Sequence, residues 1–226
     1  MGMLLALGFM AVVPPCLYTY VALLMCHRRI CLLIAYPDDE AMLFGPTLLA
    51  LTRPEAGNHV KILCLSTGDA GCLGHIRRKE LIRKKKTYMK LGSRQESDIY
   101  IMNSADFQDS SASNWDQDKI AALLEIQFTS HQVQSKAHNE NVDILITFDK
   151  HGVSSHPNQI SLHYGATAFI CNVLRQETTP VDLYTLSSVS VINVSKRCYF
   201  FNRLIGERGL PTTWSAMASA HKSQMA

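Results

Sequence analysis

Apolar runs alternate with helical periodicity along most of the chain, and this pattern predicts the elements of the fold. Short apolar segments, each of the length of a buried strand, are found at 30–36, 60–66, 98–102, 142–148 and near 183–192. Apolar positions at helical spacing predict helices over 40–52, 75–91, 116–129 and 157–175. A steady alternation of strand and helix is typical of an α/β fold with a largely parallel sheet. Residues 104–115 are polar and without periodicity, which predicts a loop.

The first 26 residues follow a different pattern, because they contain no charged side chain and are followed at once by His27, Arg28 and Arg29. An uncharged, largely apolar run of this length can span a bilayer. A cleaved signal peptide fits less well because no basic region precedes the run, and Pro14–Pro15 would break a buried helix. The pattern predicts a membrane anchor over 1–27 and a second domain over 28–226. Arginines on the C-terminal flank predict that this domain lies on the cytoplasmic side.

Composition narrows the class of protein further. A chain of 226 residues suits one domain with a sizeable core, and a net charge of +3 is too mild to indicate a nucleic-acid partner. The seven cysteines are odd in number and form no CxxC pair. This favours free thiols in a reducing compartment over a disulfide framework or a structural zinc site, in agreement with a cytoplasmic domain.

Three consecutive carboxylates, Asp38, Asp39 and Glu40, follow the first predicted strand. Crowded carboxylates are costly in a folded site unless a cation compensates them. One such carboxylate can bind a metal while its neighbour deprotonates a water molecule. The alternative is that they cap the helix predicted to start near Glu40.

A second polar segment, DKHGVSSHPNQ, follows the fourth predicted strand at 149–159. His156 precedes Pro157, and proline is a favoured first residue of a helix. An imidazole there could donate to an oxyanion or complete a metal site, and the alternative is a solvated surface histidine. Both polar segments are expected at the carboxyl edge of the sheet, where α/β proteins place their sites.

Four segments together resemble a known family: LLIAYPDDEAM, LCLSTGDAGCLGHIRRKEL, LITFDKHGVSSHPNQ and the terminal AMASAHKSQM. They are similar, in the same order, to the zinc-dependent de-N-acetylases of the PIG-L/LmbE type, and above all to the eukaryotic branch that acts on N-acetylglucosaminyl-phosphatidylinositol. The resemblance implies a Rossmann-like fold with helices on both faces of the sheet. It also implies a single-pass anchor in the endoplasmic reticulum membrane, a cytosolic catalytic domain, a glycolipid substrate and a step of GPI-anchor biosynthesis.

The resemblance also implies roles for individual residues. The family motif A-H-P-D-D-E has a general base that matches Asp38 and a zinc ligand that matches Asp39. In the motif G-H-x-x-H, the first histidine assists at the developing oxyanion and matches His156. The arginine of R-x-x-E-L is associated with substrate binding and matches Arg77. The implied activity is that of a zinc-dependent amide hydrolase.

Two zinc-ligand positions depart from the family pattern, since Tyr36 and Gln159 stand where histidines are expected. The glycine before the first histidine of G-H-x-x-H is Ser155. A phenol must deprotonate before it binds zinc, and an amide oxygen is a weak donor. Zinc is therefore expected from the family, yet Asp39 is the one ligand of the pattern that remains, and strong zinc binding is not expected. Two alternatives stay open: ligation by the Tyr36 phenolate or by His163, and a catalytically impaired homologue that binds glycolipid or a partner.

The basic segment RRKELIRKKKTYMK, at 77–90, is also compatible with two roles. Its long side chains are expected to form a solvated basic face. The alternative is attraction to anionic lipid headgroups beside the anchor.

Overall fold

The computed structural model describes residues 25–69, 73–89, 98–110, 114–129, 142–153, 155–176 and 180–188. Within them, five strands form one parallel sheet in the order β3-β2-β1-β4-β5. The strands are β1 (Arg29–Ile34), β2 (His59–Cys64), β3 (Ile99–Ile101), β4 (Ile144–Phe148) and β5 (Asp182–Leu186). The predicted α/β class and parallel sheet are confirmed. The first two strands, β1 and β2, each end two residues earlier than predicted. β1 stops at Ile34, and Tyr36 therefore belongs to the turn beyond it.

The helices are α2 (Asp39–Met42), α3 (Gly45–Leu51), α4 (Gly74–Met89), α5 (Gln117–Thr129) and α6 (Pro157–Arg175). The prediction of one helix over 40–52 was wrong, because the chain leaves the helical path at Leu43 and starts again after Phe44. Pro46 in the first turn of α3 has no backbone N–H to donate to a preceding turn, which explains the break. Short 3-10 turns, η1 (Pro54–Ala56) and η4 (Ala105–Phe107), lie in the connections.

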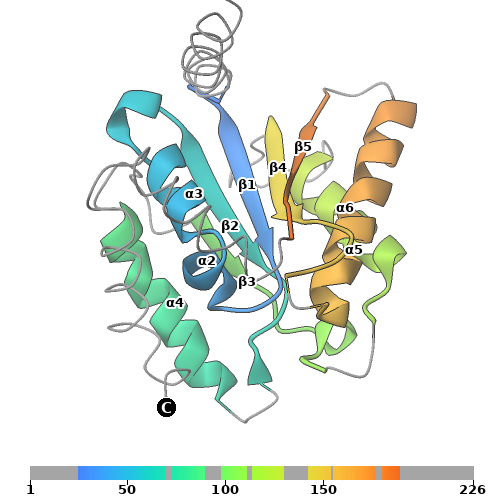
Figure 1. The fold of residues 1–226 in the computed structure, drawn as a ribbon. Helices are drawn as coiled ribbons and strands as arrows, with labels where there is room; N and C mark the ends of the chain where they lie inside the picture. The colour runs from blue at the N-terminus through green and yellow to red at the C-terminus, as the bar shows by residue number, and fades with distance from the viewer. Residues whose placement is uncertain are drawn as a thin grey trace, which may run out of the picture.

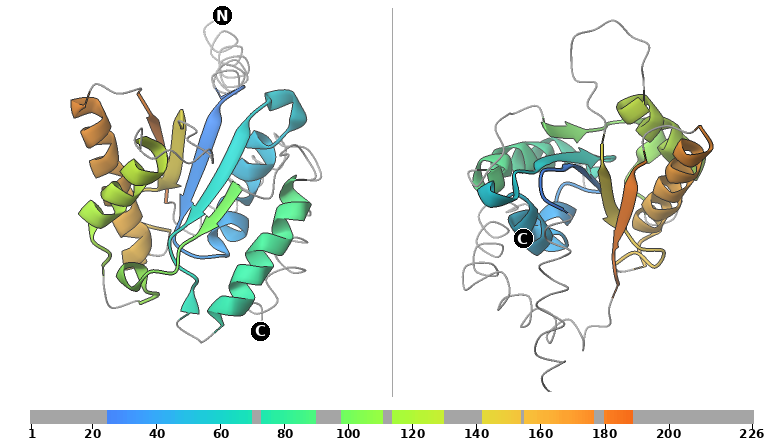
Figure 2. Two further views of the ribbon diagram at one scale, coloured as in Figure 1. Left: turned by 180° about the vertical axis from the view of Figure 1, so that it is seen from behind. Right: turned by 90° about the horizontal axis from the view of Figure 1, so that it is seen from above.

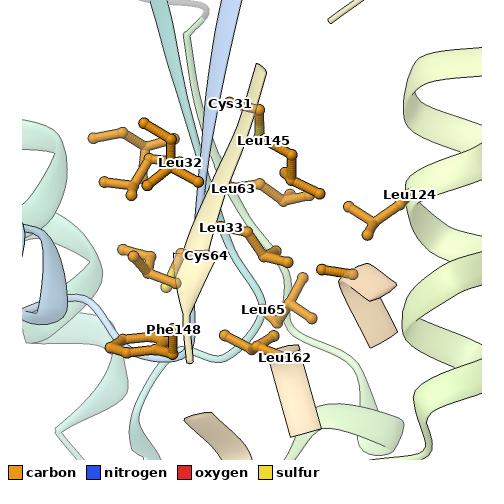
Figure 3. Packing of buried hydrophobic residues seen from close by; sticks show 14 of the residues in the cluster. Cys31, Leu32, Leu33, Leu63, Cys64, Leu65, Leu124, Leu145, Phe148 and Leu162 are labelled. Atoms are coloured by element: carbon orange, nitrogen blue, oxygen red, sulfur yellow. The ribbon is translucent and has the colours of Figure 1, made fainter. Parts of the chain in front are cut away.

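Helices cover the sheet on both faces. α5 and α6 lie against one face, and α2, α3 and α4 lie against the other (Figures 1 and 2). Because both faces are covered, strands β1 and β4 are buried along almost their whole length and read as continuous apolar runs rather than as alternating ones. Figure 3 shows Leu33, Leu63 and Leu65 on the side of the strands that faces Leu124 of α5 and Leu162 of α6.

The strand order places a topological switch between β1 and β4. From β1 the chain builds outward through β2 and β3, and then returns to add β4 and β5 on the other side. In open parallel sheets a crevice forms outside the carboxyl ends at such a switch, and ligands bind there. The turns after β1 and β4 both leave from this edge, at the lower end of the sheet in Figure 1.

No helix in the described part of the chain is long and apolar enough to cross a bilayer. The predicted anchor over 1–27 falls almost entirely on residues 1–24, which lie outside the described residues. The similarity of the terminal segment AMASAHKSQM to the family likewise concerns residues outside them.

Candidate active site at the carboxyl edge of the sheet

The turn after β1 folds around one of its own carboxylates. The backbone N–H groups of Ala35 and Tyr36 donate to Oδ2 of Asp39 at 3.0 and 2.9 Å. Asp39 begins helix α2 and is buried, whereas Asp38 at the N-cap position is only half-buried. The Asp38 side chain makes no capping hydrogen bond, so the capping alternative is wrong for this residue. The turn thus fixes Asp39 inside the protein and leaves Asp38 accessible.

The turn after β4 is held by contacts with the end of β5. Asp149 accepts hydrogen bonds from the backbone N–H of Ser188 at 2.6 Å and from that of His151 at 3.1 Å. The hydroxyl of Ser188 lies 2.7 Å from Oδ1 of Asp149 and 2.8 Å from the carbonyl oxygen of Gly152. Gly152 adopts a φ of 58°, and a Cβ there would lie 3.1 Å from Cγ1 of Ile160. These contacts set the direction in which the chain enters α6.

His156 is the N-cap residue of α6 and is followed by Pro157 in the first turn, as the sequence predicts. Its Nδ1 accepts a hydrogen bond from the backbone N–H of Asn158 at 3.4 Å. Because Nδ1 is the acceptor, the neutral ring carries its proton on Nε2, which is then available as a donor. The imidazole also packs edge-on against the ring of Tyr36, with 5.3 Å between ring centroids.

Four side chains join the two turns, and we call them the polar cross-link: Tyr36, Asp39, Asn158 and Gln159. Nε2 of Gln159 donates to Oδ1 of Asp39 at 3.1 Å. Nδ2 of Asn158 donates to the Tyr36 hydroxyl oxygen at 2.6 Å. The structure thus brings both altered ligand positions, Tyr36 and Gln159, to Asp39 and His156, although some 120 residues separate the two turns.

The loop over 104–115 also contributes to the site, which the sequence interpretation missed. Nδ2 of Asn158 lies 3.2 Å from the carbonyl oxygen of Ser110, and the side chain of Asp109 hydrogen-bonds to the Tyr36 phenol. Trp115 packs on the Tyr36 ring, with 6.2 Å between centroids. The available signal was the pair of aromatic residues, Phe107 and Trp115, in an otherwise polar loop, since buried aromatics hold loops to a core.

Arg77 reaches the same edge from the first turn of α4. Its Nη1 lies 2.8 Å from the point where a Cβ would stand on Gly68, which has a φ of 68°. That point is also 3.4 Å from Cδ of Pro37, so the guanidinium passes over Gly68 beside the turn that carries Asp38. Within the described residues, the buried Nε of Arg77 has no hydrogen-bond partner.

Burial dominates the electrostatics of the site. It raises the pKa of Asp39 well above its usual range, and the charge of Asp38 adds to this, while the two backbone N–H bonds oppose it. Burial likewise raises the pKa of the Tyr36 phenol, more than the hydrogen bond from Asn158 lowers it. The phenol is therefore neutral at physiological pH.

Comparison with known proteins identifies the family. The family model described as PIG-L: GlcNAc-PI de-N-acetylase matches residues 31–170, a range that includes both turns. This chain belongs to the PIG-L family. The N-acetylglucosaminyl-phosphatidylinositol de-N-acetylase of Arthroderma benhamiae is 44% identical over 196 residues, which are 73% of this chain and 57% of that protein. The protein of the same name from Bos taurus is 36% identical over 135 residues, 60% of this chain and 47% of that protein. This chain thus spans between about half and 57% of the length of these relatives.

A solved structure confirms the fold of the PIG-L chain. The N,N'-diacetylchitobiose deacetylase from Pyrococcus horikoshii superimposes with a TM-score of 0.50 at 15% identity. The similarity covers 79% of this chain and 69% of that one. At this identity the likeness is one of fold.

The PIG-L pattern also explains the backbone before His156. Ser155 stands where the family motif has glycine, and it adopts a φ of 58°. This left-handed conformation is easy for glycine and strained for serine, by about 1 kcal/mol. The turn therefore has a geometry at Ser155 that a glycine would adopt with less strain.

The residues at the family's zinc position do not fit zinc. Gln159 presents an N–H donor to Asp39, and a carboxamide nitrogen does not ligate zinc. The Tyr36 oxygen accepts a hydrogen bond from Asn158 and belongs to a neutral phenol. The described residues contain no group of three His, Cys, Asp or Glu side chains that could hold a metal, and the alternative ligand, His163, one turn beyond Gln159, therefore belongs to no such group.

Proposed function

We propose that this chain is a de-N-acetylase of N-acetylglucosaminyl-phosphatidylinositol, a hydrolase of GPI-anchor biosynthesis. The observation that carries the proposal is the PIG-L match over residues 31–170, within which Asp38 and His156 belong to turns at one edge of the sheet. The names of the relatives from Arthroderma benhamiae and Bos taurus support the choice of substrate.

Hydrolysis of an acetamide requires an activated water and a partner for the oxyanion of the tetrahedral intermediate. Asp38 is the half-buried carboxylate of the first turn, and its role is to accept the proton of the attacking water and to return it to the amine nitrogen as the C–N bond breaks. His156 holds its proton on Nε2 because Nδ1 accepts the N–H of Asn158. Its role is to donate a hydrogen bond from Nε2–H to the oxyanion. No step is assigned to zinc, because the side chains at its position do not fit it.

Arg77 is proposed to bind the substrate. Its guanidinium lies over Gly68 beside the Asp38 turn, and a guanidinium forms strong, paired hydrogen bonds with phosphate oxygens. The phosphodiester of a phosphatidylinositol lipid supplies such oxygens.

The proposed location is the endoplasmic reticulum membrane, with a single anchor over 1–27 and a catalytic domain over 28–226 on the cytoplasmic side. The uncharged run before His27 and the arginines that follow it support this proposal, as does a lipid substrate.

The test is acetate release from N-acetylglucosaminyl-phosphatidylinositol by the full chain in detergent or in lipid vesicles. We expect Asp38→Asn and His156→Ala each to lower kcat by about 100-fold or more, the range for loss of a general base or an oxyanion donor. Asp143→Asn is the matched control, because Asp143 precedes β4 at the opposite end of the sheet, where it pairs with Arg29. Glycolipid binding without any acetate release would overturn the proposal and favour the non-catalytic alternative.

A further inference from the structure

We infer that protein hydrogen bonds take the place of the metal in this PIG-L chain. The Gln159 carboxamide donates a hydrogen bond to Asp39 at the position where the family holds zinc. The inference concerns the metal alone, and it stands or falls independently of whether the chain turns over substrate.

The first support is the way in which Asp39 is already surrounded by donors. Oδ2 accepts from the N–H groups of Ala35 and Tyr36, and Oδ1 accepts from Nε2 of Gln159. A cation on Oδ1 would have to displace the amide group of Gln159. The amide would then lose a hydrogen bond in a site where Gln159 is buried, which costs about 1–3 kcal/mol for an unpaired polar group.

The second support is that the carboxamide cannot turn its oxygen toward Asp39. Oε1 of Gln159 accepts a hydrogen bond from the backbone N–H of Val153 at 3.1 Å. A flipped amide would place its NH₂ group against the N–H of Val153 and its oxygen against the carboxylate of Asp39, and both contacts would be repulsive. The orientation that puts a donor on Asp39 is therefore fixed at both ends.

The third support comes from the other altered position. The Tyr36 oxygen receives the N–H of Asn158 at 2.6 Å, and the side chain of Asp109 also hydrogen-bonds to the phenol. Asn158 is fully buried and in turn lies 3.2 Å from the carbonyl oxygen of Ser110. The lone pair of the Tyr36 oxygen, which a metal would need, thus faces the amide of Asn158. This amide belongs to α6 and also contacts the loop at Ser110.

The same geometry shows how little separates this site from a metal site. Asp39 keeps its backbone cradle, and it is reached by the side chain of position 159 and by the backbone N–H of position 36. Imidazoles at these two positions would supply, together with the Asp39 carboxylate, three ligands of zinc-binding type.

The experiment measures zinc directly on the purified full chain, after chelator treatment and removal of the chelator. Zinc affinity is obtained by competition with a chromophoric chelator, and Tm is measured with and without zinc. We expect the wild-type chain to retain far less than one zinc per chain and to show no zinc-dependent rise in Tm. The double variant Tyr36→His with Gln159→His should bind one zinc per chain, at least about 100-fold more tightly than wild type, with a rise in Tm.

Two control variants identify the ligands in the double variant. Asp39→Ala added to it should abolish zinc binding, whereas His163→Ala should leave binding unchanged. If the double variant fails to fold, the wild-type measurement still decides. One zinc per wild-type chain, lost on Asp39→Ala, would overturn the inference.

An activity measurement separates this inference from the proposed function. Acetate release that persists in the presence of chelator would support both. Zinc-dependent release would overturn the inference and keep the proposed function. A chain that binds no zinc and releases no acetate would keep the inference and overturn the proposed function.

Discussion

The two turns that meet at the candidate site are held in different ways. The turn after β1 is closed by its own backbone, since the donors to Asp39 lie three and four residues before it. The turn after β4 has a local bond from the N–H of His151 to Asp149, and it is also held by Ser188, which follows β5 and is 39 residues away from Asp149. The contacts with Asp39 that close the first turn are all within four residues, whereas the second turn gains its contacts with Ser188 only when the last described strand is in place. Changes in the first turn should therefore act on the site directly, and changes in the second should act through the position of α6.

The largest expected effect is that of Asp39→Ala in the first turn. The substitution removes the acceptor of two backbone N–H groups and of the Gln159 amide, all in a buried setting. Each unsatisfied buried donor costs about 1–3 kcal/mol, and the costs of neighbouring donors do not add in full. We therefore expect a loss of about 3 kcal/mol in the free energy of unfolding. Urea unfolding measures it. Asp143→Ala, at the opposite end of the sheet and partly exposed, should cost less than about 1 kcal/mol. Equal losses would contradict the proposed importance of the first turn.

Asn158→Ala tests the connection between the turns and should cost about 2 kcal/mol. The side chain is fully buried and donates to the Tyr36 hydroxyl, with the Ser110 carbonyl oxygen also in reach. Asn172→Ala on the same helix is the matched control, because Asn172 is half-buried and bonds to Glu125 at 2.7 Å. The control should lose about 1 kcal/mol or less. A larger loss in the control would show that the polar cross-link contributes little.

Ser188→Ala should weaken the second turn by about 1 kcal/mol at neutral pH, since the hydroxyl loses its contacts with Asp149 and with the carbonyl oxygen of Gly152. The effect should depend on pH. Partial burial raises the pKa of Asp149, but the hydrogen bonds from Ser188 and His151 lower it by more, to below its ordinary value of 3.8. A lowered pKa in the folded state stabilises the protein above the unfolded value, and this is lost as the pH falls through the folded value. The difference between wild type and Ser188→Ala should therefore shrink below pH 3.8, measured by urea unfolding across the acid range. A difference that stays constant would assign the effect to the Gly152 contact alone.

The smallest effect should be a gain. Ser155→Gly relieves a left-handed φ of 58° before His156, but it also makes the unfolded chain more flexible. The two contributions nearly balance, and we expect stabilisation of up to about 1 kcal/mol, measured as a rise in Tm. Ser161→Gly, inside α6, is the control and should be destabilising. Destabilisation by Ser155→Gly would mean that the serine makes a contact that outweighs its strain.

Much of the fold could be predicted from the sequence because it depends on local patterns. Helix α6 spans the predicted range of 157–175, since Pro157 marks its start and its apolar positions repeat at helical spacing. The predicted helix over 40–52 was wrong because the apolar pattern continues across Leu43 and Phe44. A helix that began before Pro46 could not continue past it, so a new helix begins at Gly45. Periodicity reports which face is buried, and it does not report a break within that face.

The site could be predicted only in part. Asp38, Asp39 and His156 follow strand ends, so their meeting at one edge follows from a parallel sheet. The orientation of the Gln159 amide could not be predicted, because it depends on the N–H of Val153 and on Asp39, which come from different turns. The contribution of Asp109 depends on how a non-periodic loop packs, and Trp115 is the residue that holds this loop against Tyr36.

The two-ended bond of Gln159 also has a consequence for dynamics. Val153 lies in an exposed turn, where a backbone amide hydrogen ordinarily exchanges rapidly with solvent. Here that proton is bonded to Oε1 of a side chain whose other end is bound to Asp39. This proton can exchange only when its hydrogen bond to Oε1 of Gln159 is broken. The exchange rate of this one amide in deuterated water therefore reports how often the Gln159 carboxamide releases the backbone N–H of Val153.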